Sequence, residues 1–379
     1  MYQARKLRFA VFVASLSPIG AIAQVPDMLA AFDAGGRALG AGTSIYATGA
    51  DTLSATYNPA ALGYVNRGMF TYATRNLPRT STRVSGSLDK LFLDSSEGSG
   101  DFGVGHVGVA MPLRTRGGGQ RGAFTLSWTI AGWFHDTQFG TALDPGIESY
   151  TDFTRARTEL VTLGYGSTTA GQSVSWGAGA VFATQSIRNF QQITFEDPKI
   201  PPQIADTDNT GFGIGGLLGV MIVPGGNSNI TYGVSVRTPI DLKKGGSDLP
   251  LYSRIPGRAV AGIAAVRDGL RGGRDSLLFG AQVEHYFGGK SSERLDRDDQ
   301  TVFGVGVEYQ YARGGGVIPI RLGYRVVPAG GQDFANRHGV SFGVGYRPSN
   351  LNWSIELNLA WPAGGELDSS LAIGYRFGN

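Results

Sequence analysis

The sequence predicts an all-β protein, a transmembrane antiparallel β-barrel. Three observations indicate this fold: strands that alternate apolar and polar residues throughout the C-terminal half, a glycine-rich composition with few charges, and an N-terminal export signal. In an outer-membrane barrel, lipid-facing and lumen-facing side chains alternate along every strand, and aromatic residues gather at both membrane interfaces. One exposed sandwich strand can alternate as well, so the recurrence of the pattern carries the prediction.

The alternation is clearest in residues 352–361. One face of this segment is apolar and the other is mostly polar. Trp353 and Trp361, at the two ends of the apolar face, lie about 26 Å apart along an extended strand. We therefore expect both tryptophans at lipid interfaces, Leu357 in the lipid between them, and Glu356 on the lumen side.

Charges and glycines on the polar faces of these strands indicate what fills the lumen of the barrel. Glycine accounts for 59 of 379 residues, roughly twice its usual share, and many glycines occupy the polar face, where a small residue lets an interior plug approach. Charges in mid-strand on that face predict a wet or plugged lumen. The expected lumen-facing charges are Glu284, Glu308, Arg321, Arg325, Arg347, Glu356 and Arg376.

The first 23 residues are predicted to be a signal peptide. Three basic residues form its start, residues 9–22 its apolar core, and Ala21-Ile22-Ala23 a cleavage site, so Gln24 becomes the first mature residue. A membrane anchor is the alternative, but serines and a proline interrupt the short apolar core. Cleavage leaves 30 basic and 30 acidic residues, so the basic precursor gives no reason to expect nucleic acid as a partner. The absence of cysteine excludes disulfides and thiolate metal sites.

The mature chain divides into residues 24–66, rich in Ala and Gly without strict alternation, and residues 67–379, which carry the strands. The second part holds fifteen candidate strands, and one of them is expected to be a loop or plug strand because such barrels have an even strand count. The candidates are residues 68–75, 82–88, 104–113, 122–132, 157–165, 173–184, 211–223, 229–238, 257–266, 276–287, 301–311, 317–327, 338–347, 352–361 and 369–377.

Linker length predicts the orientation of the barrel. Short turns, such as residues 224–229 and 348–350, contrast with polar insertions at residues 137–152, 189–210 and 288–299. Short turns face the periplasm and long loops the outside in known barrels. We therefore interpret the three insertions as outer loops.

The N-terminal part carries a family resemblance. Residues 33–42 (DAGGRALGAG), followed by Ala50-Asp51 and residues 55–63 (ATYNPAALG), resemble the N-terminal signature of the FadL/OMPP1 superfamily, including its PorV-type branch. The resemblance implies about fourteen strands and an N-terminal hatch inside the lumen, residues 24–66 here. The expected hatch and ligand-route residues are Gly36, Arg37, Ala38, Gly40, Gly42, Asn58, Pro59 and Ala60.

Two features of this part also have a local interpretation. Pro59 fixes its own φ and holds Asn58 extended, so Asn58-Pro59-Ala60 forms a rigid corner, either a simple turn or a hinge beside the ligand route. Arg37 is either solvated or tethers the hatch to a lumen carboxylate, for which Glu284, Glu308 and Glu356 are the candidates.

Residues for catalysis or cofactor binding do not form a recognisable pattern. The four histidines, at positions 106, 135, 285 and 338, lack metal-ligand spacing. Two G-x-G-x-x-G matches, at residues 103–108 and 211–216, open no helix and are expected by chance in so glycine-rich a chain. No Ser/His pair has a defensible arrangement. We expect no enzyme, no cofactor and no metal.

The function follows mainly from the resemblance. FadL members pass hydrophobic molecules from the lumen into the membrane through an opening in the wall. The resemblance therefore implies a transporter of hydrophobic small molecules, similar to long-chain fatty acids. It also implies a location in the outer membrane of a Gram-negative envelope. PorV-type members serve type IX secretion, so a secretion or surface-assembly partner is the alternative, and a structural barrel is the third. The expected partners are outer-membrane lipid and a hydrophobic ligand, with secretion-system or exported proteins under the alternative, and no nucleic acid.

Overall fold

A computed structural model shows the fold of this chain. It describes residues 35–76, 81–82, 87–88, 91–97, 102–114, 120–142, 147–169, 171–226, 228–245, 247–248, 253–292, 295–328, 336–362 and 367–378. The predicted signal peptide, residues 1–23, and the first part of the predicted hatch, residues 24–34, lie outside the described residues.

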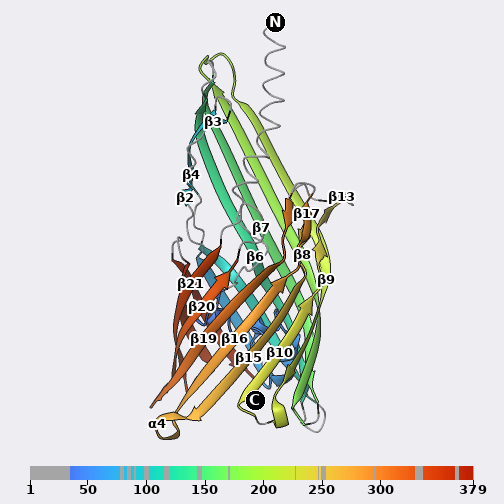
Figure 1. Cartoon of the computed structure of the whole chain (residues 1–379), viewed down its shortest axis with the longest axis vertical. Helices are drawn as coiled ribbons and strands as arrows, with labels where there is room; N and C mark the ends of the chain where they lie inside the picture. Colours follow the sequence, from blue (N-terminus) through green and yellow to red (C-terminus); the bar gives the residue numbers. More distant parts are fainter. Residues whose placement is uncertain are drawn as a thin grey trace.

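Fourteen antiparallel strands form a closed barrel, which confirms the predicted fold class (Figure 1). Each strand pairs with the next, and the last pairs with the first, for example at Tyr72↔Ile373. The strands are β1 (Gly68–Asn76), β5 (Phe102–Arg114), β6 (Gln120–Ala142), β7 (Ile147–Thr168), β8 (Val174–Phe195), β9 (Gln203–Ile222), β10 (Ile230–Arg237), β15 (Arg258–Gly269), β16 (Asp275–Tyr286), β19 (Gln300–Arg313), β20 (Gly316–Val327), β21 (Arg337–Pro348), β22 (Trp353–Pro362) and β23 (Asp368–Phe377).

The surplus candidate is residues 82–88. Only β2 (Ser81–Thr82) and β3 (Ser87–Leu88) are described there, and both pair with β4 (Leu91–Glu97), which the sequence did not predict. β4 in turn pairs with the far end of β6, at Phe92↔Thr141. This small sheet therefore extends the wall beyond the barrel and does not belong to the ring.

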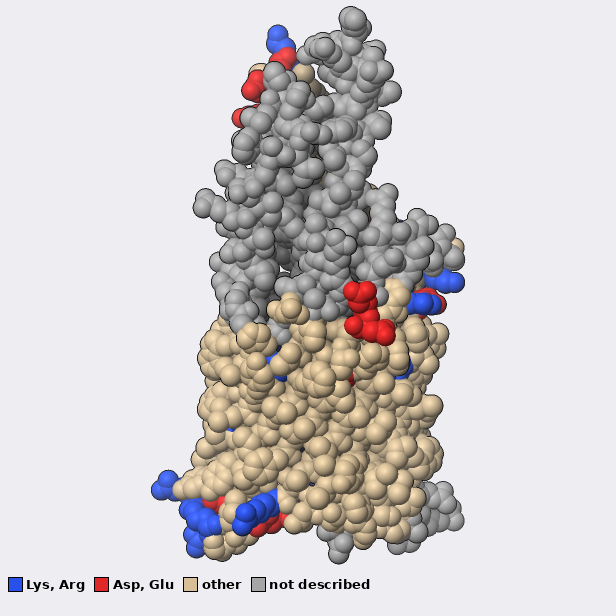
Figure 2. Space-filling view, viewed as in Figure 1, with Lys and Arg blue, Asp and Glu red and all other residues tan. Residues whose placement is uncertain are grey.

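The outer face carries the apolar stripes. Leu357 is 44% exposed whereas the neighbouring Glu356 is 7% exposed, so the pleat of β22 puts the two side chains on opposite faces of the wall. Trp353 and Trp361 are 37% and 43% exposed on the same outer face. Figure 2 shows the result, a broad band almost free of charge with charged residues gathered beyond its edges. A polar band would be unstable there, since hydrocarbon cannot solvate charges.

Two of the three insertions interpreted as loops are largely strand. β6 and β7 pair as far as Gly140↔Tyr150, and β8 and β9 as far as Ile193↔Gln203, so these four strands project well beyond the others (Figure 1). Their outer parts are rich in polar residues and lack a regular apolar stripe, which hides the strand pattern in the sequence. The third insertion contains a hairpin of β17 (Gly289–Ser292) and β18 (Leu295–Arg297).

The short helices and strands in the connections between barrel strands lie at the two ends of the barrel. The end with short turns, hereafter the turn end, carries η2 (Pro224–Gly226) and α4 (Leu270–Gly273). The opposite end, hereafter the loop end, carries β11 (Ile240–Asp241), β12 (Lys243–Lys244), β13 (Ser247–Asp248) and β14 (Arg254–Ile255). Among the described residues, no helix is long and apolar enough to cross a membrane.

At the loop end, the connection between β10 and β15 folds against the inner face of the wall. Ile240 and Ile255, paired across β11 and β14, are fully buried and pack with Leu217 of β9. β9 has a glycine at position 215 opposite this loop, where a Cβ would come within 2.7 Å of Ile240. The lumen is therefore narrowed at this end by apolar packing.

Candidate functional site

Residues 35–66, hereafter the lumen segment, are packed inside the barrel. They form three short helices, α2 (Arg37–Gly40), α3 (Thr52–Ala55) and η1 (Pro59–Tyr64), whose side chains are almost all buried. α2 contacts β20, β21 and β22, whereas η1 contacts β6 to β9. The segment therefore bridges one side of the wall to the other across the lumen.

A band of glycines on the inner face of the wall lets the lumen segment approach this closely. A Cβ at Gly233 of β10 would stand 2.0 Å from the carbonyl oxygen of Ala47, and a Cβ at Gly304 of β19 would stand 2.2 Å from that of Gly42. Gly42 itself has φ of 63°, a conformation that side chains disfavour. Larger residues at these positions would force the segment away from the wall.

The corner Asn58-Pro59-Ala60 lies at the centre of this packing. Asn58 is fully buried and extended (φ −138°, ψ 103°), and its Oδ1 accepts a hydrogen bond from the amide of Ala60 at 3.1 Å. Its Nδ2 donates to the carbonyls of Ala47 at 2.9 Å and Val220 of β9 at 3.3 Å. One side chain therefore caps η1, joins two parts of the lumen segment and ties both to the wall.

The other predicted hatch residues are packed against the wall. The amide of Gly36 donates to Ser370 Oγ of β23 at 2.8 Å, and Ala38 is 3% exposed. A Cβ at Gly40 would lie 2.4 Å from Asn358 Oδ1. These residues therefore form a close interface with β21 to β23.

An ion-pair network attaches α2 to the wall. Arg37 Nε and Nη2 donate to the two oxygens of Glu308 at 2.7 and 2.9 Å. Arg321, which is fully buried, donates through Nε to Glu308 at 2.6 Å and through Nη2 to Glu356 at 3.1 Å, and Arg347 donates to Glu356 at 2.9 Å. Of the three candidate carboxylates, Glu308 is therefore the partner of Arg37.

Electrostatics favours the charged form of Arg37. Burial by itself lowers the pKa of its guanidinium, but the adjacent Glu308 carboxylate outweighs burial and raises that pKa above the ordinary value. The bidentate contact is the geometry in which Arg and carboxylate interact most strongly. Arg37 therefore stays positively charged in this contact.

The remaining predicted lumen charges have different surroundings. Glu284 is 1% exposed and accepts hydrogen bonds from Tyr286 at 2.7 Å and from Gln282 at 2.9 Å. Arg325 is half-buried on β20, and Arg376 is exposed near the turn end of β23. Hydrogen bonds therefore group Glu308, Arg321, Glu356 and Arg347, and Arg376 lines the same cavity as Arg347 and Glu356.

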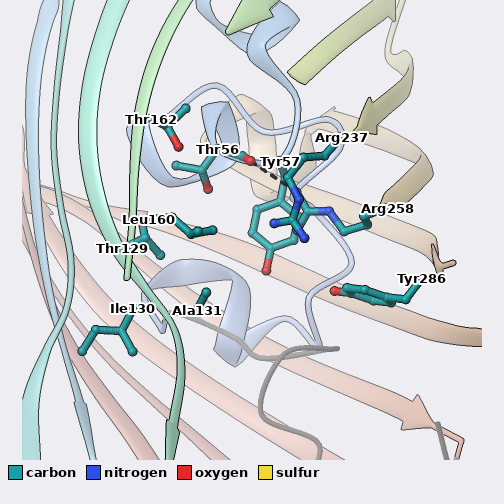
Figure 3. A pocket seen from close by; sticks show the side chains of 10 residues that line it. All are labelled: Thr56, Tyr57, Thr129, Ile130, Ala131, Leu160, Thr162, Arg237, Arg258 and Tyr286. Atoms are coloured by element: carbon teal, nitrogen blue, oxygen red, sulfur yellow. Dashed lines mark hydrogen bonds between the residues drawn. The ribbon is translucent and has the colours of Figure 1, made fainter. Parts of the chain in front are cut away.

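A second basic cluster was not among the site residues predicted from the sequence. Arg237, the last residue of β10, and Arg258, the first residue of β15, lie opposite each other and are 7% and 5% exposed. They line a cavity of about 40 Å³ together with Tyr57 and Tyr286 (Figure 3). Alternation along β10 puts Arg237 on the same face as the buried Ser235, so the pattern contained a signal for its orientation.

A larger cavity, of about 320 Å³, lies at the turn end. Its lining includes Arg37 and Leu53 from the lumen segment, Glu356 from the inner face of β22, and Trp353 and Ile373 from the outer face of the wall. The cavity therefore lies between the lumen segment and the strands β1, β22 and β23.

The histidines in the described part of the chain form hydrogen bonds with neighbouring hydroxyl groups. His106 is fully buried between Thr52 of α3, at 3.0 Å, and Thr129 of β6, at 2.9 Å, so it helps to position the lumen segment. His285 and His338 bond to Thr301 and Tyr324, at 3.0 and 3.2 Å. Within the part of the chain that the structure describes, no group of three or more His, Asp or Glu could hold a metal ion.

Comparisons with known proteins identify the fold. No protein-family model matches the chain, and no curated protein is similar in sequence. A Pseudomonas aeruginosa FadL homologue is similar in structure, with 15% identity and a TM-score of 0.58 over 91% of this chain and 98% of that one. The Ralstonia pickettii toluene transporter TbuX gives 16% identity and a TM-score of 0.61, over 92% and 99%. The monoaromatic hydrocarbon channel CymD gives 14% identity and a TM-score of 0.54, over 90% of this chain and 99% of that one.

These similarities span nearly the full length of both chains. They agree with the FadL part of the resemblance in the sequence, whereas the PorV-type branch stays a prediction. The chain therefore has the fold of the FadL-type channels, an outer-membrane β-barrel of Gram-negative type with fourteen strands.

Proposed function

We propose that this protein carries hydrophobic small molecules, similar to long-chain fatty acids, across the outer membrane, and that residues 24–66 form a hatch that gates the route. The observation that carries the proposal is the filled lumen with a cavity of about 320 Å³ between the lumen segment and the wall. A water-filled pore would pass polar solutes by diffusion. A plugged barrel passes only molecules for which the hatch rearranges.

The cavity lining has an apolar part and a charged part. Leu53 of the lumen segment, Phe70, Trp353 and Ile373 belong to the lining, and so do Arg37, Arg67, Arg347 and Arg376. A molecule with an apolar chain and a polar head, as a fatty acid has, can therefore contact both parts. Structurally similar channels described as toluene transporters and as a monoaromatic hydrocarbon channel agree with such a substrate class.

The closure of the barrel beside this cavity supports an exit through the wall. Between the pairs Ala73↔Ala372 and Asn76↔Ser369 the ladder of β1 and β23 is interrupted. There, Thr74 Oγ1 donates to the carbonyl of Leu371 at 3.3 Å and accepts from its amide at 3.2 Å. A side chain replaces backbone pairing at this point, so separating the two strands breaks fewer backbone bonds than elsewhere.

The test is uptake and binding of a fluorescent long-chain fatty acid by the wild type and by Asn58→Ala. The substitution removes three hydrogen bonds of a buried side chain that joins the hatch to β9, so we expect altered uptake in a barrel that remains folded. Asn350→Ala is the matched control, because Asn350 is exposed in a turn. Heat-shifted gel mobility reports folding.

Saturable binding and uptake that are equal in all three proteins would contradict the gating role of Asn58. Absence of binding by the wild type would contradict the transport proposal itself.

The second candidate function is a secretion or surface-assembly partner. The observation that favours it is the projection of β6 to β9 beyond the barrel, which offers a broad sheet at the loop end (Figure 1). Polar pairs such as Arg188 and Asp206 are exposed there. Failure to bind fatty acid, together with capture of an exported protein that is lost when this projection is shortened, would favour the second candidate.

A further inference from the structure

Arg237 and Arg258 form an unusual pair inside the barrel. They face each other directly on neighbouring strands, and both are more than nine-tenths buried. Like charges directly opposite each other across two strands destabilise a sheet, and a buried charge is costly unless it is paired. The pair therefore needs a compensating interaction.

The protein supplies only part of that compensation. Arg237 Nη2 donates to the carbonyl of Pro256 at 3.0 Å, and Arg258 Nη2 to that of Thr56 at 3.2 Å. Arg258 also lies over the ring of Tyr57 at 4.0 Å. All three partners are neutral. Among the described residues neither arginine forms an ion pair, in contrast to Arg321, which contacts two carboxylates.

Each guanidinium also keeps one hydrogen-bond donor without a partner. Within the described residues, the Nε atoms of Arg237 and Arg258 are buried and have no acceptor. The nearby carboxylate of Glu284 already accepts from Tyr286 and Gln282. Unsatisfied buried donors are rare in folded proteins and often mark a ligand position.

The cavity between these groups has the size and chemistry of a small anion site. Its volume of about 40 Å³ is close to that of one or two water molecules, so it accommodates a head group and not a whole substrate. The two arginines line it together with hydroxyl-bearing side chains, Thr129 and Thr162 of the wall and Tyr286 of β16 (Figure 3). Leu160 supplies an apolar side.

We propose that Arg237 and Arg258 bind a carboxylate group in the lumen, and that this group is the acidic head of an amphiphilic substrate. A carboxylate provides the negative charge and the acceptors that two facing guanidiniums require, and arginine recognises it through a planar fork of donors. This identification of the substrate class rests on the proposed transport function. It distinguishes acids from neutral hydrocarbons of the same chain length.

The site also connects the ligand to the hatch. Tyr57, which lies under Arg258, stacks on Tyr46 with ring centroids 3.9 Å apart, and both tyrosines belong to the lumen segment. The hydroxyl of Ser235 on β10 donates to the carbonyl of Tyr57 at 2.6 Å. A carboxylate that draws the two guanidiniums together therefore acts directly on residues that hold the hatch in place.

Isothermal titration calorimetry of the full-length protein in non-ionic detergent at pH 8 tests the site. The probes are dodecanoate, dodecanol and acetate, so that the contributions of tail and head are separated. The variants are Arg237→Gln and Arg258→Gln, with Arg258→Lys as a form that keeps the charge. Arg188→Gln is the control, because Arg188 is an exposed arginine at the loop end. Heat-shifted gel mobility reports folding and its stabilisation by acetate.

The wild type is expected to bind dodecanoate about tenfold or more tightly than dodecanol, since hydrogen bonds to charged groups are the stronger ones. The two glutamine variants should lose this preference, whereas Arg188→Gln should keep it. Arg258→Lys should retain part of it, which would exclude loss through misfolding.

The outcomes separate this inference from the proposed function. Equal binding of dodecanoate and dodecanol by the wild type would overturn the carboxylate site while supporting transport of hydrophobic molecules. Stabilisation by acetate that depends on the two arginines, without binding of either amphiphile, would support the site as one for a free carboxylate and would contradict the transport proposal. Absence of all three effects would overturn both.

Discussion

Arg37→Ala should release the hatch from the barrel wall. Arg37 is the residue of α2 that forms two hydrogen bonds to Glu308 of β19, at 2.7 and 2.9 Å. Glu308 stays satisfied after the substitution, because Arg321 and Gln310 also donate to it, at 2.6 and 2.7 Å. The change therefore weakens the attachment of the hatch more than it weakens the wall.

The magnitude follows from the geometry. Hydrogen bonds between charged groups contribute about 1.5 to 3 kcal/mol, and the side chain of Arg37 is 22% exposed, so we take a value of about 2 kcal/mol for the attachment. If the hatch opens locally, a loss of this size raises the population of the open form by roughly thirtyfold.

Hydrogen–deuterium exchange measured by mass spectrometry reads this population directly. Peptides from residues 35–66 should exchange about thirtyfold faster in Arg37→Ala, whereas peptides from β15 to β22 should change little. Arg347→Ala is the matched control. Arg347 is similarly buried, at 27% exposure, and pairs with Glu356 at 2.9 Å, but both residues belong to the wall.

Unchanged exchange of residues 35–66 in Arg37→Ala would refute the reasoning, because the ion pair would then not hold the hatch. Equal acceleration in Arg347→Ala would also refute it, since the effect would then arise from general loosening of the barrel.

Three further predictions concern packing, membrane insertion and export. Gly219→Ala should displace the hatch and destabilise the protein by about 1 to 3 kcal/mol in urea titration, because the new Cβ would stand 2.0 Å from Asn58 Oδ1. Gly216→Ala is the control and should be nearly neutral, because its Cβ would meet its nearest neighbour at 3.8 Å. Equal effects of the two substitutions would contradict the argument that glycines on the inner face let the hatch approach the wall. Leu357→Arg should lower the free energy of unfolding in lipid by roughly 2 to 4 kcal/mol, and an unchanged value would place Leu357 outside the bilayer. Mass spectrometry of membrane-inserted protein should find Gln24 as the first residue, and an intact Met1 would indicate an anchor.

The sequence was sufficient to predict the fold because the relevant signal is local. In β22, Leu357 and Glu356 are neighbours in the chain, and the pleat alone decides that they face opposite sides. The same rule identified thirteen further barrel strands. It failed for the projections of β6 to β9, where the residues are mostly polar and no apolar stripe marks the strands.

Contacts across the lumen could not be predicted from the sequence. Arg37 could be assigned three candidate carboxylates, and only the fold selected Glu308, which is 271 residues away in the chain. The selection depends on the stagger of successive strands, which accumulates around a closed barrel and leaves no mark on any single strand.

The sequence by itself therefore determined which residues face lipid and which face the lumen, since strand pleating has a fixed period of two. The tertiary structure decided which lumen residues meet. It brought Arg237 beside Arg258 through the pairing of β10 with β15, and it placed Gly219 under Asn58. Both juxtapositions arise from strand register and barrel closure, which are properties of the whole chain and not of any local segment.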